Sequence, residues 1–519
     1  MGQWFCGDTI HGTLIISMTF CNGYPFSPHI FLLESVSCSY LYPPILPFLA
    51  VSLGCQPCYN AYMNNIVEKT LIKYAPPALL ILLGGWFALW AFGAGYSVAA
   101  MAAALFSAGL FGLCLAKLPP YLQLWLSKGD PIPPQAGLRA SRFDRRHPWA
   151  AIALRIVLLH IILYAAAYIF DLEKNGYSGG MLDTMARLWN RTDAPHYQGI
   201  AQNWYVTEGD PRFHIVFFPL YPLLIKAFNF IIGNYFASAL VVSNLCSIGC
   251  GIMAYELAAL DMERRDALFT AAILSVFPGS FFLAAPMTES LFLLLSLSCM
   301  FCARKKKYLL AGGFGALAAF TRSVGLLLVL PVFIEALGDY FRNKPLGTKA
   351  IASRLCGTAM IVLGTLGYLL INHLVTGSAL TFLTYQREHW SQGLGPFFGT
   401  AAYQTDLLIK NLIEDNPQLA YGLFLPNLLC AFVSLALLFP AMKRLRPSYS
   451  GYALVYFAVT IGCTWLLSGP RYLAVCFPIA FGIAELTKGK KFLRTAALML
   501  LGTSMLVYLW MFVTGYPVY

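Results

Sequence analysis

The chain has 519 residues, of which 58% are hydrophobic and only 11% are charged, and its formal net charge is +12. Soluble domains carry about 25% charged residues, so this composition excludes a chain built mainly of soluble domains. The positive balance does not indicate a nucleic-acid partner, because the Lys and Arg residues form short clusters between apolar runs, where they set membrane topology.

Residues 1–62 differ from the rest of the chain. They are rich in Cys, Pro and Tyr and contain no clean apolar run of about 20 residues. No Lys or Arg precedes Lys69, so the segment lacks the basic start of a secretory signal peptide, and one hypothesis is that the natural start is Met63. Cys55 and Cys58 form a CxxC pair, but without a second pair at metal-ligand spacing two ordinary thiols explain it better than a metal site.

Long apolar runs fill the remainder and predict an all-α fold, a polytopic bundle of transmembrane helices. We expect residues 63–149 to contribute two extra helices and a cytoplasmic linker, and residues 150–519 to form the main membrane domain. The candidate spans are 76–94, 98–117, 150–170, 236–259, 267–285, 289–302, 308–337 (long enough for two short elements), 351–373, 419–441, 450–468, 472–487 and 493–513.

Six clusters of Lys and Arg orient these spans, because cytoplasmic loops carry the excess of positive charge. The loops between the clusters then face outward, and the first of them, 171–214, is large. The clusters are Arg139 to Arg146, Arg264–Arg265, Arg304 to Lys307, Arg342 to Arg354, Lys443 to Arg446 and Lys488 to Arg494; the other outer loops are 284–289, 374–418 and 467–471.

The segment 213–233 does not fit this scheme as a simple span. It is apolar enough to cross, but crossing would move two basic clusters to the outer face. Pro219, Pro222 and Lys226 also make it a poor straight helix. We therefore predict a broken or re-entrant element on the outer side, which requires protein or a water-filled cavity around it.

The first outer loop holds the best candidate for chemistry. Asp193 lies among Trp189, His196, Tyr197 and Trp204. A carboxylate can take a proton from an attacking hydroxyl, and aromatic rings can stack on sugar faces, so the pattern suits sugar transfer. Two simpler explanations stand beside it: the rings form an interfacial belt, and Asp193 caps a helix that starts at Ala194.

Three further charged residues lie at membrane depth or at its outer edge, where charges are functional candidates because their burial costs free energy. Glu289 lies at the outer end of two adjacent spans, Arg322 interrupts the apolar run 308–337, and Arg471 opens the 472–487 span. Arginine recognises phosphate with two parallel hydrogen bonds, so Arg322 and Arg471 are candidates for holding a lipid phosphate. The alternative is an internal ion pair of Glu289 with Arg322.

Other polar residues of the outer loops are candidates for substrate contacts. His214 enters the broken element and is suited to a phosphate or sugar, although a structural histidine explains it as well. Gln386 and Trp390, together with Arg387 and His389, lie in the long outer loop 374–418 and are suited to sugar hydroxyls, unless that loop is simply a lid.

Four ordered blocks of these residues resemble the PIG-V-like mannosyltransferases, the family that adds the second mannose of GPI anchors, and its bacterial relatives. The first reads Trp189 to Tyr205 followed by FFPLYP from Phe217, similar to W-x-x-W-D-A-x-H-Y-x-x-I-A-x-x-G-Y and F-F-P-x-Y-P. Thr192, Trp204 and Met287 replace the usual Trp, Gly and Tyr. The other blocks are FPGSFFLAAPMTESLF from Phe277, Ala311 to Leu326 with Thr321-Arg322, and Pro470 to Leu473 with Phe477-Pro478; the resemblance covers about residues 150–515.

The resemblance implies a GT-C-like membrane glycosyltransferase with short helices in its first outer or lumenal loop. Such enzymes move a sugar, here mannose, from a polyprenyl- or dolichyl-phosphate to an acceptor glycan, glycolipid or protein with inversion. Asp193 would be the catalytic base, and Arg322 or Arg471 would stabilise the lipid phosphate. The donor is a monophosphate, so the resemblance implies no cofactor and requires no metal.

A multi-pass transporter or lipid flippase is the main alternative, since it also needs buried charges and broken helices. The absence of an internal repeat and the outer Asp among aromatic rings favour the enzyme. The residue pattern resembles the bacterial relatives more closely, which favours a bacterial plasma membrane; a eukaryotic protein would lie in the endoplasmic reticulum membrane.

Overall fold

A computed structural model describes the chain from residue 78 onward, with gaps. The predictions for residues 1–62, for the start at Met63 and for the arginines between Arg139 and Arg146 lie outside the described residues. From Ala75 to Tyr519 the chain forms one compact unit, and every regular element in its described part is helical. The described residues are 78, 82, 84–87, 89–128, 147–176, 180–343, 347–393, 395, 397–462 and 468–519.

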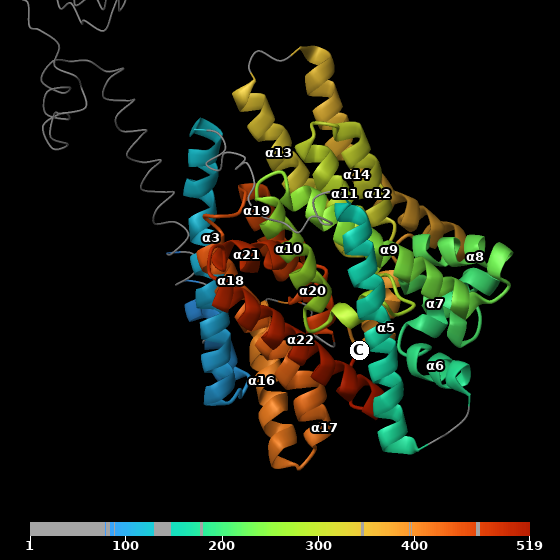
Figure 1. The fold of residues 1–519 in the computed structure, drawn as a ribbon. Helices are drawn as coiled ribbons and strands as arrows, with labels where there is room; N and C mark the ends of the chain where they lie inside the picture. The colour runs from blue at the N-terminus through green and yellow to red at the C-terminus, as the bar shows by residue number, and fades with distance from the viewer. Residues whose placement is uncertain are drawn as a thin grey trace, which may run out of the picture. The chain divides into compact units, whose positions relative to one another are not determined.

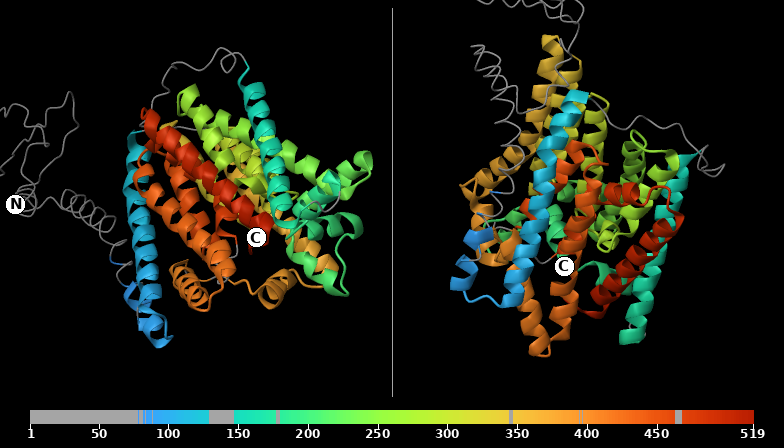
Figure 2. Two further views of the ribbon diagram at one scale, coloured as in Figure 1. Left: turned by 60° about the horizontal axis from the view of Figure 1, so that its bottom comes forward. Right: turned by 90° about the vertical axis from the view of Figure 1, so that its left-hand side faces the viewer.

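Seven helices in this part are long and apolar enough to cross a membrane, which confirms a polytopic helical bundle. Helix α22 packs beside α5, and α12 packs against α14 (Figures 1 and 2). The seven are α3 (Val98–Lys128), α5 (Pro148–Asn175), α9 (Tyr235–Ala258), the continuous pair η3 (Ser323–Leu328) and α13 (Val329–Arg342), α14 (Thr348–Thr376), the run α17 (Pro417–Leu419), η4 (Ala420–Phe424) and α18 (Leu425–Ala441), and α22 (Lys491–Thr514).

Two predicted spans are wrong as continuous helices. The span 267–285 divides into α10 (Arg264–Val276) and the short η2 (Ser280–Leu283), and 472–487 divides into α20 (Gly469–Ala474) and α21 (Phe477–Leu486). Pro278 and Pro478 lie at the breaks, where a missing N–H and a fixed φ end a helix. Around them lie the shorter helices α11 (Glu289–Arg304), α12 (Tyr308–Ala319) and α19 (Pro447–Thr460). The run 308–337 thus holds two elements, as predicted.

The first outer loop carries short helices, as expected. They are α6 (Met181–Trp189) and α7 (Ala194–Asn203), which lie beside the end of α5 (Figure 1). The broken element follows as η1 (Asp210–Val216) and α8 (Leu220–Ile232), bent by 111° against each other, so the prediction of a broken element there is confirmed. The long outer loop 374–418 also holds helices, α15 (Thr381–Trp390) and α16 (Phe397–Ile413).

Helix α3, one of the two extra helices expected in residues 63–149, is packed into the unit. The Tyr121 hydroxyl donates to the Leu445 carbonyl at 2.8 Å, and Lys117 donates to the Phe439 carbonyl at 3.2 Å. Trp125 is buried against Gly338, and the guanidinium of Arg446 lies over its ring. Helix α3 therefore supports the bundle along α18 and α19 (Figure 1).

The basic clusters of the described part meet at one end of the bundle, as a common assignment to the cytoplasmic face requires. Ion pairs between segments far apart in sequence hold them there. Helix α11 runs from this end to Glu289, and its 16 residues span about 24 Å. The pairs are Arg304–Asp261, Arg446–Asp261, Arg446–Glu335, Lys306–Asp339, Arg354–Asp339 and Arg494–Asp266.

Helices α12 and α14 approach closely because glycines line their contact. A Cβ on Gly364 would collide with the Ala316 carbonyl, and one on Gly357 would collide with the Tyr308 carbonyl. In lipid, where no hydrophobic effect drives helices together, small residues of this kind let backbones pack directly. The crossing places the loop that follows α12, and with it Arg322, inside the bundle.

We expect Gly364→Ala to lower the free energy of unfolding by about 1–3 kcal/mol, because the added methyl group overpacks the crossing. The matched control is Gly313→Ala on α12, where a Cβ meets no atom within 4 Å; it should be neutral or stabilising by up to about 1 kcal/mol. Denaturant unfolding in detergent measures both, and equal losses in the two variants would contradict the close crossing.

Candidate functional site

Two of the sequence blocks meet at Arg471. Gly279 lies against the backbone of Pro470 and Arg471, where a Cβ would collide with the Pro470 carbonyl. On the other side, the Asn427 side chain of α18 accepts a hydrogen bond from the Gly469 backbone N–H at 2.8 Å. The short helix that carries Arg471 is therefore held on one side by the close contact with Gly279 and on the other by the hydrogen bond from Gly469 to Asn427.

Arg471 joins a chain of four charged side chains. Its Nε donates to Glu289 Oε1 at 2.6 Å, and its Nη2 donates to Asp193 Oδ2 at 2.7 Å. Arg322 donates from Nη1 to the same Glu289 oxygen and to the Thr288 hydroxyl, the latter at 3.2 Å. Glu289 thus holds two guanidinium groups side by side, and the ion pair of Glu289 with Arg322 that the sequence offered as an alternative is present.

Exposure increases along this chain of charges. The Glu289 and Arg471 side chains are 1% and 4% exposed, Arg322 is 15% exposed and Asp193 is 30% exposed. Glu289 and Arg471 form an enclosed centre, and Asp193 and Arg322 lie nearer its open side. A ligand that enters would meet the Asp193 carboxylate and Arg322 first.

The structure argues against helix capping as the explanation of Asp193. It is the N-cap residue of α7, but its side chain makes no capping hydrogen bond. Its carboxylate instead bonds Arg471, nearly 280 residues away in sequence. Helix capping therefore does not account for this residue.

Two departures from the family signature occupy left-handed backbone. Thr192 has φ 55° directly before Asp193, and Trp204 has φ 62° at the end of α7. Residues with a Cβ pay about 1–2 kcal/mol for this conformation, and glycine, the usual residue at the second position of the signature, does not. Strained backbone of this kind is retained mainly at functional sites, and here it flanks both ends of the helix that starts at Asp193.

A group of imidazole and aromatic rings lies one helical turn beyond Asp193. His196 Nδ1 and His214 Nε2 are 3.0 Å apart, and the His196 ring stacks on Phe217 with centroids 5.1 Å apart. Trp390 of α15 meets the Phe217 ring edge-on at 5.8 Å. The structure thus brings His196, His214 and Trp390 together, with Gln386 on the same helix as Trp390.

Burial lowers the pKa of both histidines. For His196, the carboxylate of Asp193 opposes this effect and His389 adds to it. Burial lowers the pKa of His214 to about 4, and the neighbouring His196 and His389 contribute in the same direction. Both rings are therefore neutral at neutral pH, and one can donate a hydrogen bond to the other.

Two predicted substrate contacts need correction. Trp189 is 1% exposed and packs among the rings of Tyr164, Phe281 and Phe512, so no sugar can stack on it. Tyr197 is also buried, and its hydroxyl lies 3.4 Å from that of Thr288. Both side chains belong to the packed core next to the site, because these aromatic residues of the loop face the interior of the protein.

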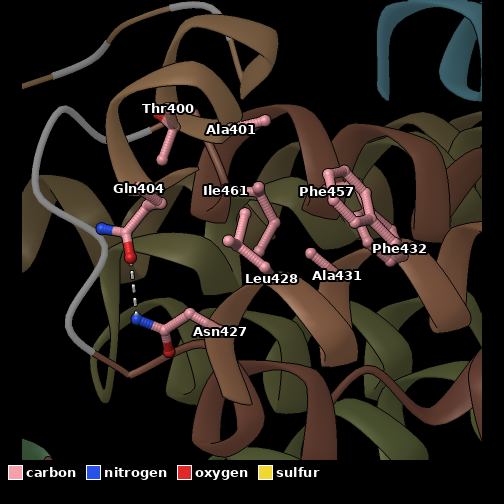
Figure 3. Close-up of a pocket in the computed structure, with 9 residues that line it drawn as sticks. All are labelled: Thr400, Ala401, Gln404, Asn427, Leu428, Ala431, Phe432, Phe457 and Ile461. Carbon is pink, nitrogen blue, oxygen red and sulfur yellow. Dashed lines mark hydrogen bonds between the residues drawn. The ribbon is translucent and has the colours of Figure 1, made fainter. Parts of the chain in front are cut away.

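A small pocket lies apart from this site, between α16, α18 and α19 (Figure 3). Its wall is mostly apolar, and its polar end is the contact between Asn427 and Gln404, at 3.3 Å (Figure 3). Asn427 also accepts the hydrogen bond of Gly469, at the start of the helix that carries Arg471. The pocket therefore adjoins a residue that positions this helix, and none of the four charged side chains lines it.

Sequence reasoning missed Gly279, Thr288 and Asn427, which hold Arg471, Arg322 and Tyr197 in place. Gly279 and Thr288 lie inside the sequence blocks, and that position was the only signal for them. Asn427 lies outside the blocks, so the sequence held no signal for it. In the part of the chain that the structure describes, no group of three or more His, Cys, Asp or Glu side chains has the geometry of a metal site.

Comparisons with known proteins give one family match and several structural matches. Residues 217–368, less than a third of the chain, match the family described as dolichyl-phosphate-mannose-protein mannosyltransferase. No curated protein matches the chain.

Among solved structures, the chain is similar to ArnT from Cupriavidus metallidurans bound to undecaprenyl phosphate, with 16% identity over 63% of this chain and 59% of that one and a TM-score of 0.40. It is also similar to the oligosaccharyltransferase AglB from Archaeoglobus fulgidus in complex with an inhibitory peptide and a dolichol-phosphate, with 12% identity over 73% of this chain and 56% of that one and a TM-score of 0.41. The match thus spans less than three fifths of each solved protein.

We expect Glu289→Gln to lower the free energy of unfolding by about 3–5 kcal/mol, because it leaves two buried guanidinium groups without their common anion. The same substitution at Glu414, whose pair with Lys410 is more than half exposed, should change it by less than about 0.5 kcal/mol. Denaturant unfolding in detergent compares them, and a stable Glu289→Gln protein would contradict the role of Glu289 as the anchor.

The histidine pair should make stability fall in acid. The pKa of His214 is about 4 in the folded protein and near 6.5 in the unfolded chain, so the unfolded state binds more protons between these values. Stability is then complete above about pH 6.5 and is lost as the pH falls toward 4. Thermal unfolding from pH 7.5 to 5 measures this, and His214→Gln should flatten the curve; an unchanged slope would contradict it.

Proposed function

We propose that the protein is a membrane glycosyltransferase of the GT-C type that transfers a sugar from a polyprenyl- or dolichyl-phosphate donor to an acceptor hydroxyl, with inversion. The observation that carries the proposal is the linked group of Asp193, Arg471, Glu289 and Arg322. In it the partly exposed Asp193 carboxylate bonds one guanidinium group, and Glu289 joins that group to a second. It combines a proton acceptor with two phosphate-binding groups.

In this proposal Asp193 accepts the proton of the acceptor hydroxyl. The acceptor oxygen forms a bond to the anomeric carbon from the face opposite the phosphate, which inverts that carbon. The bond from the anomeric carbon to the phosphate oxygen breaks, and its electron pair leaves with the lipid phosphate. The leaving group gains one negative charge, which Arg322 and Arg471 stabilise because they are already fixed by Glu289.

The ring group forms the other wall of the proposed site. His196, His214 and Trp390 come from three different elements; His196 lies one turn beyond Asp193 on α7, His214 contacts His196, and Trp390 meets the Phe217 ring on which His196 stacks. Neutral imidazoles and an indole edge suit the hydroxyls and the apolar face of a sugar. Gln386, one turn before Trp390 on α15, is placed to add a hydrogen bond from the same helix.

We further propose mannose as the sugar, and an acceptor glycan, glycolipid or protein on the outer or lumenal face. The four blocks support mannose, as does the description of the family that matches residues 217–368. The assignment to the outer face rests on the basic clusters at the opposite end of the bundle. The PIG-V-like relationship and a bacterial plasma membrane are the finer parts of this proposal.

We expect Asp193→Asn to reduce transfer about 10²- to 10⁴-fold, because general-base catalysis contributes a factor of that size. The assay measures transfer from polyprenyl-phosphate mannose to endogenous acceptors in membranes that carry wild type or variant. Asp183→Asn, an exposed carboxylate of the same outer loop, is the control and should keep wild-type activity.

Equal transfer by wild type and Asp193→Asn would reject Asp193 as the base. Absence of transfer in wild-type membranes, combined with movement of the lipid-linked sugar across the bilayer, would favour the flippase alternative instead.

A further inference from the structure

We infer that Arg471 exchanges partners during the reaction: it binds Asp193 in the resting enzyme and the donor phosphate in the substrate complex, so that donor binding releases the base. The inference rests on the proposed function and concerns the control of the same site. In this inference the Asp193–Arg471 contact keeps Asp193 from acting as the base until a phosphate takes its place on Arg471.

The two contacts of Arg471 differ in how easily they can be replaced. The contact of Nε with Glu289 is enclosed, with both side chains less than 5% exposed. The contact of Nη2 with Asp193 lies toward the open side, where the carboxylate is 30% exposed. Water screens an exposed pair and weakens it, whereas a buried pair is broken only at high cost. Arg471 can therefore release Asp193 while Glu289 keeps the guanidinium in place.

A base in this position must offer a carboxylate oxygen to the acceptor hydroxyl. In the resting arrangement Asp193 Oδ2 accepts the hydrogen bond of Arg471 Nη2 at 2.7 Å, so Arg471 occupies the oxygen that lies inside the charged cluster. Release of Arg471 makes that oxygen available to the acceptor hydroxyl.

Charge balance ties this release to the donor. Two carboxylates and two guanidinium groups make the resting cluster neutral. The phosphodiester of the donor adds one negative charge, and it competes with Asp193 for Nη2 of Arg471. The product phosphate carries one more negative charge, while Asp193 has become neutral by accepting the proton, so the total does not change during the transfer.

Arg322 provides the second half of the phosphate site. Its Nη1 is bonded to Glu289 and Thr288, whereas among the described residues no acceptor is bonded to its Nε or Nη2. Its guanidinium lies 5.3 Å from the centre of the Tyr472 ring, next to Arg471 in sequence. Since Glu289 Oε1 accepts from both arginines, their remaining donors lie close enough to share one phosphate.

The exchange also explains product release. While Asp193 carries the proton, nothing competes with the lipid phosphate for Arg471. When Asp193 passes that proton to water, its carboxylate regains Arg471 and displaces the phosphate. Asp193 and the lipid phosphate therefore compete for Arg471 both when the donor binds and when the product leaves.

Direct binding of a lipid phosphate tests the exchange. The probe is radiolabelled undecaprenyl phosphate, bound to the purified full-length protein in detergent, with undecaprenol as the probe that lacks the phosphate. Asp193→Asn should bind undecaprenyl phosphate about fivefold more tightly than wild type, because it removes the competitor for Arg471. Arg471→Lys should bind it more weakly, and Asp183→Asn should match wild type.

The outcomes separate the exchange from the proposed function. Asp193→Asn that has lost transfer but binds the lipid phosphate no more tightly than wild type would overturn the exchange and leave Asp193 as the base. Equally tighter binding of undecaprenol would also overturn it, since the change would then concern the isoprenoid chain. Asp193→Asn that still transfers sugar would instead overturn the proposed function.

Discussion

The structure depends on one buried carboxylate, Glu289, which accepts hydrogen bonds from two arginines with the same oxygen. A charge at this depth is tolerated only when it is paired, and here one anion compensates two cations, Arg322 and Arg471, that come from segments far apart in sequence. Without Glu289, Arg322 would have no carboxylate partner among the described residues, and Arg471 would keep only the partly exposed Asp193. Their positions are therefore fixed before any substrate binds, which is the condition for electrostatic stabilisation of a leaving group.

This constraint explains why the helices around the site are short. Arg471 reaches Glu289 because the chain breaks between α20 and α21, and Arg322 reaches it because α12 ends in the 3₁₀ segment that starts at Ser323. Non-helical backbone at membrane depth is tolerated where protein surrounds it, and here the glycine contact of Gly279 with Pro470 provides that surrounding. The long helices α5, α14 and α22 lie outside this region and supply the membrane-facing surface, as their exposed apolar residues show.

The sequence predicted the features that depend on local pattern. Apolar length predicted the helical bundle, Pro219 and Pro222 predicted the broken element, and the isolated charges singled out Glu289, Arg322 and Arg471 as candidates, with a Glu289–Arg322 pair as one alternative. The sequence could not predict the pairs of Arg471 with Glu289 and Asp193, because only the tertiary fold brings these residues together. It also placed Trp189 at the surface of the site, since periodicity in a nine-residue helix does not say which face is covered by α22.

Glu289 has one further property that bears on function. Its second oxygen, Oε2, is buried without a hydrogen-bond partner among the described residues. An unsatisfied buried acceptor costs about 1–3 kcal/mol, more when it is charged, and a fold that needed only a buried ion pair would have no reason to retain it. A carboxylate that gives one oxygen to two arginines holds their guanidinium groups closer together than separate partners would. In the proposed function, this arrangement presents two adjacent cations to the donor phosphate.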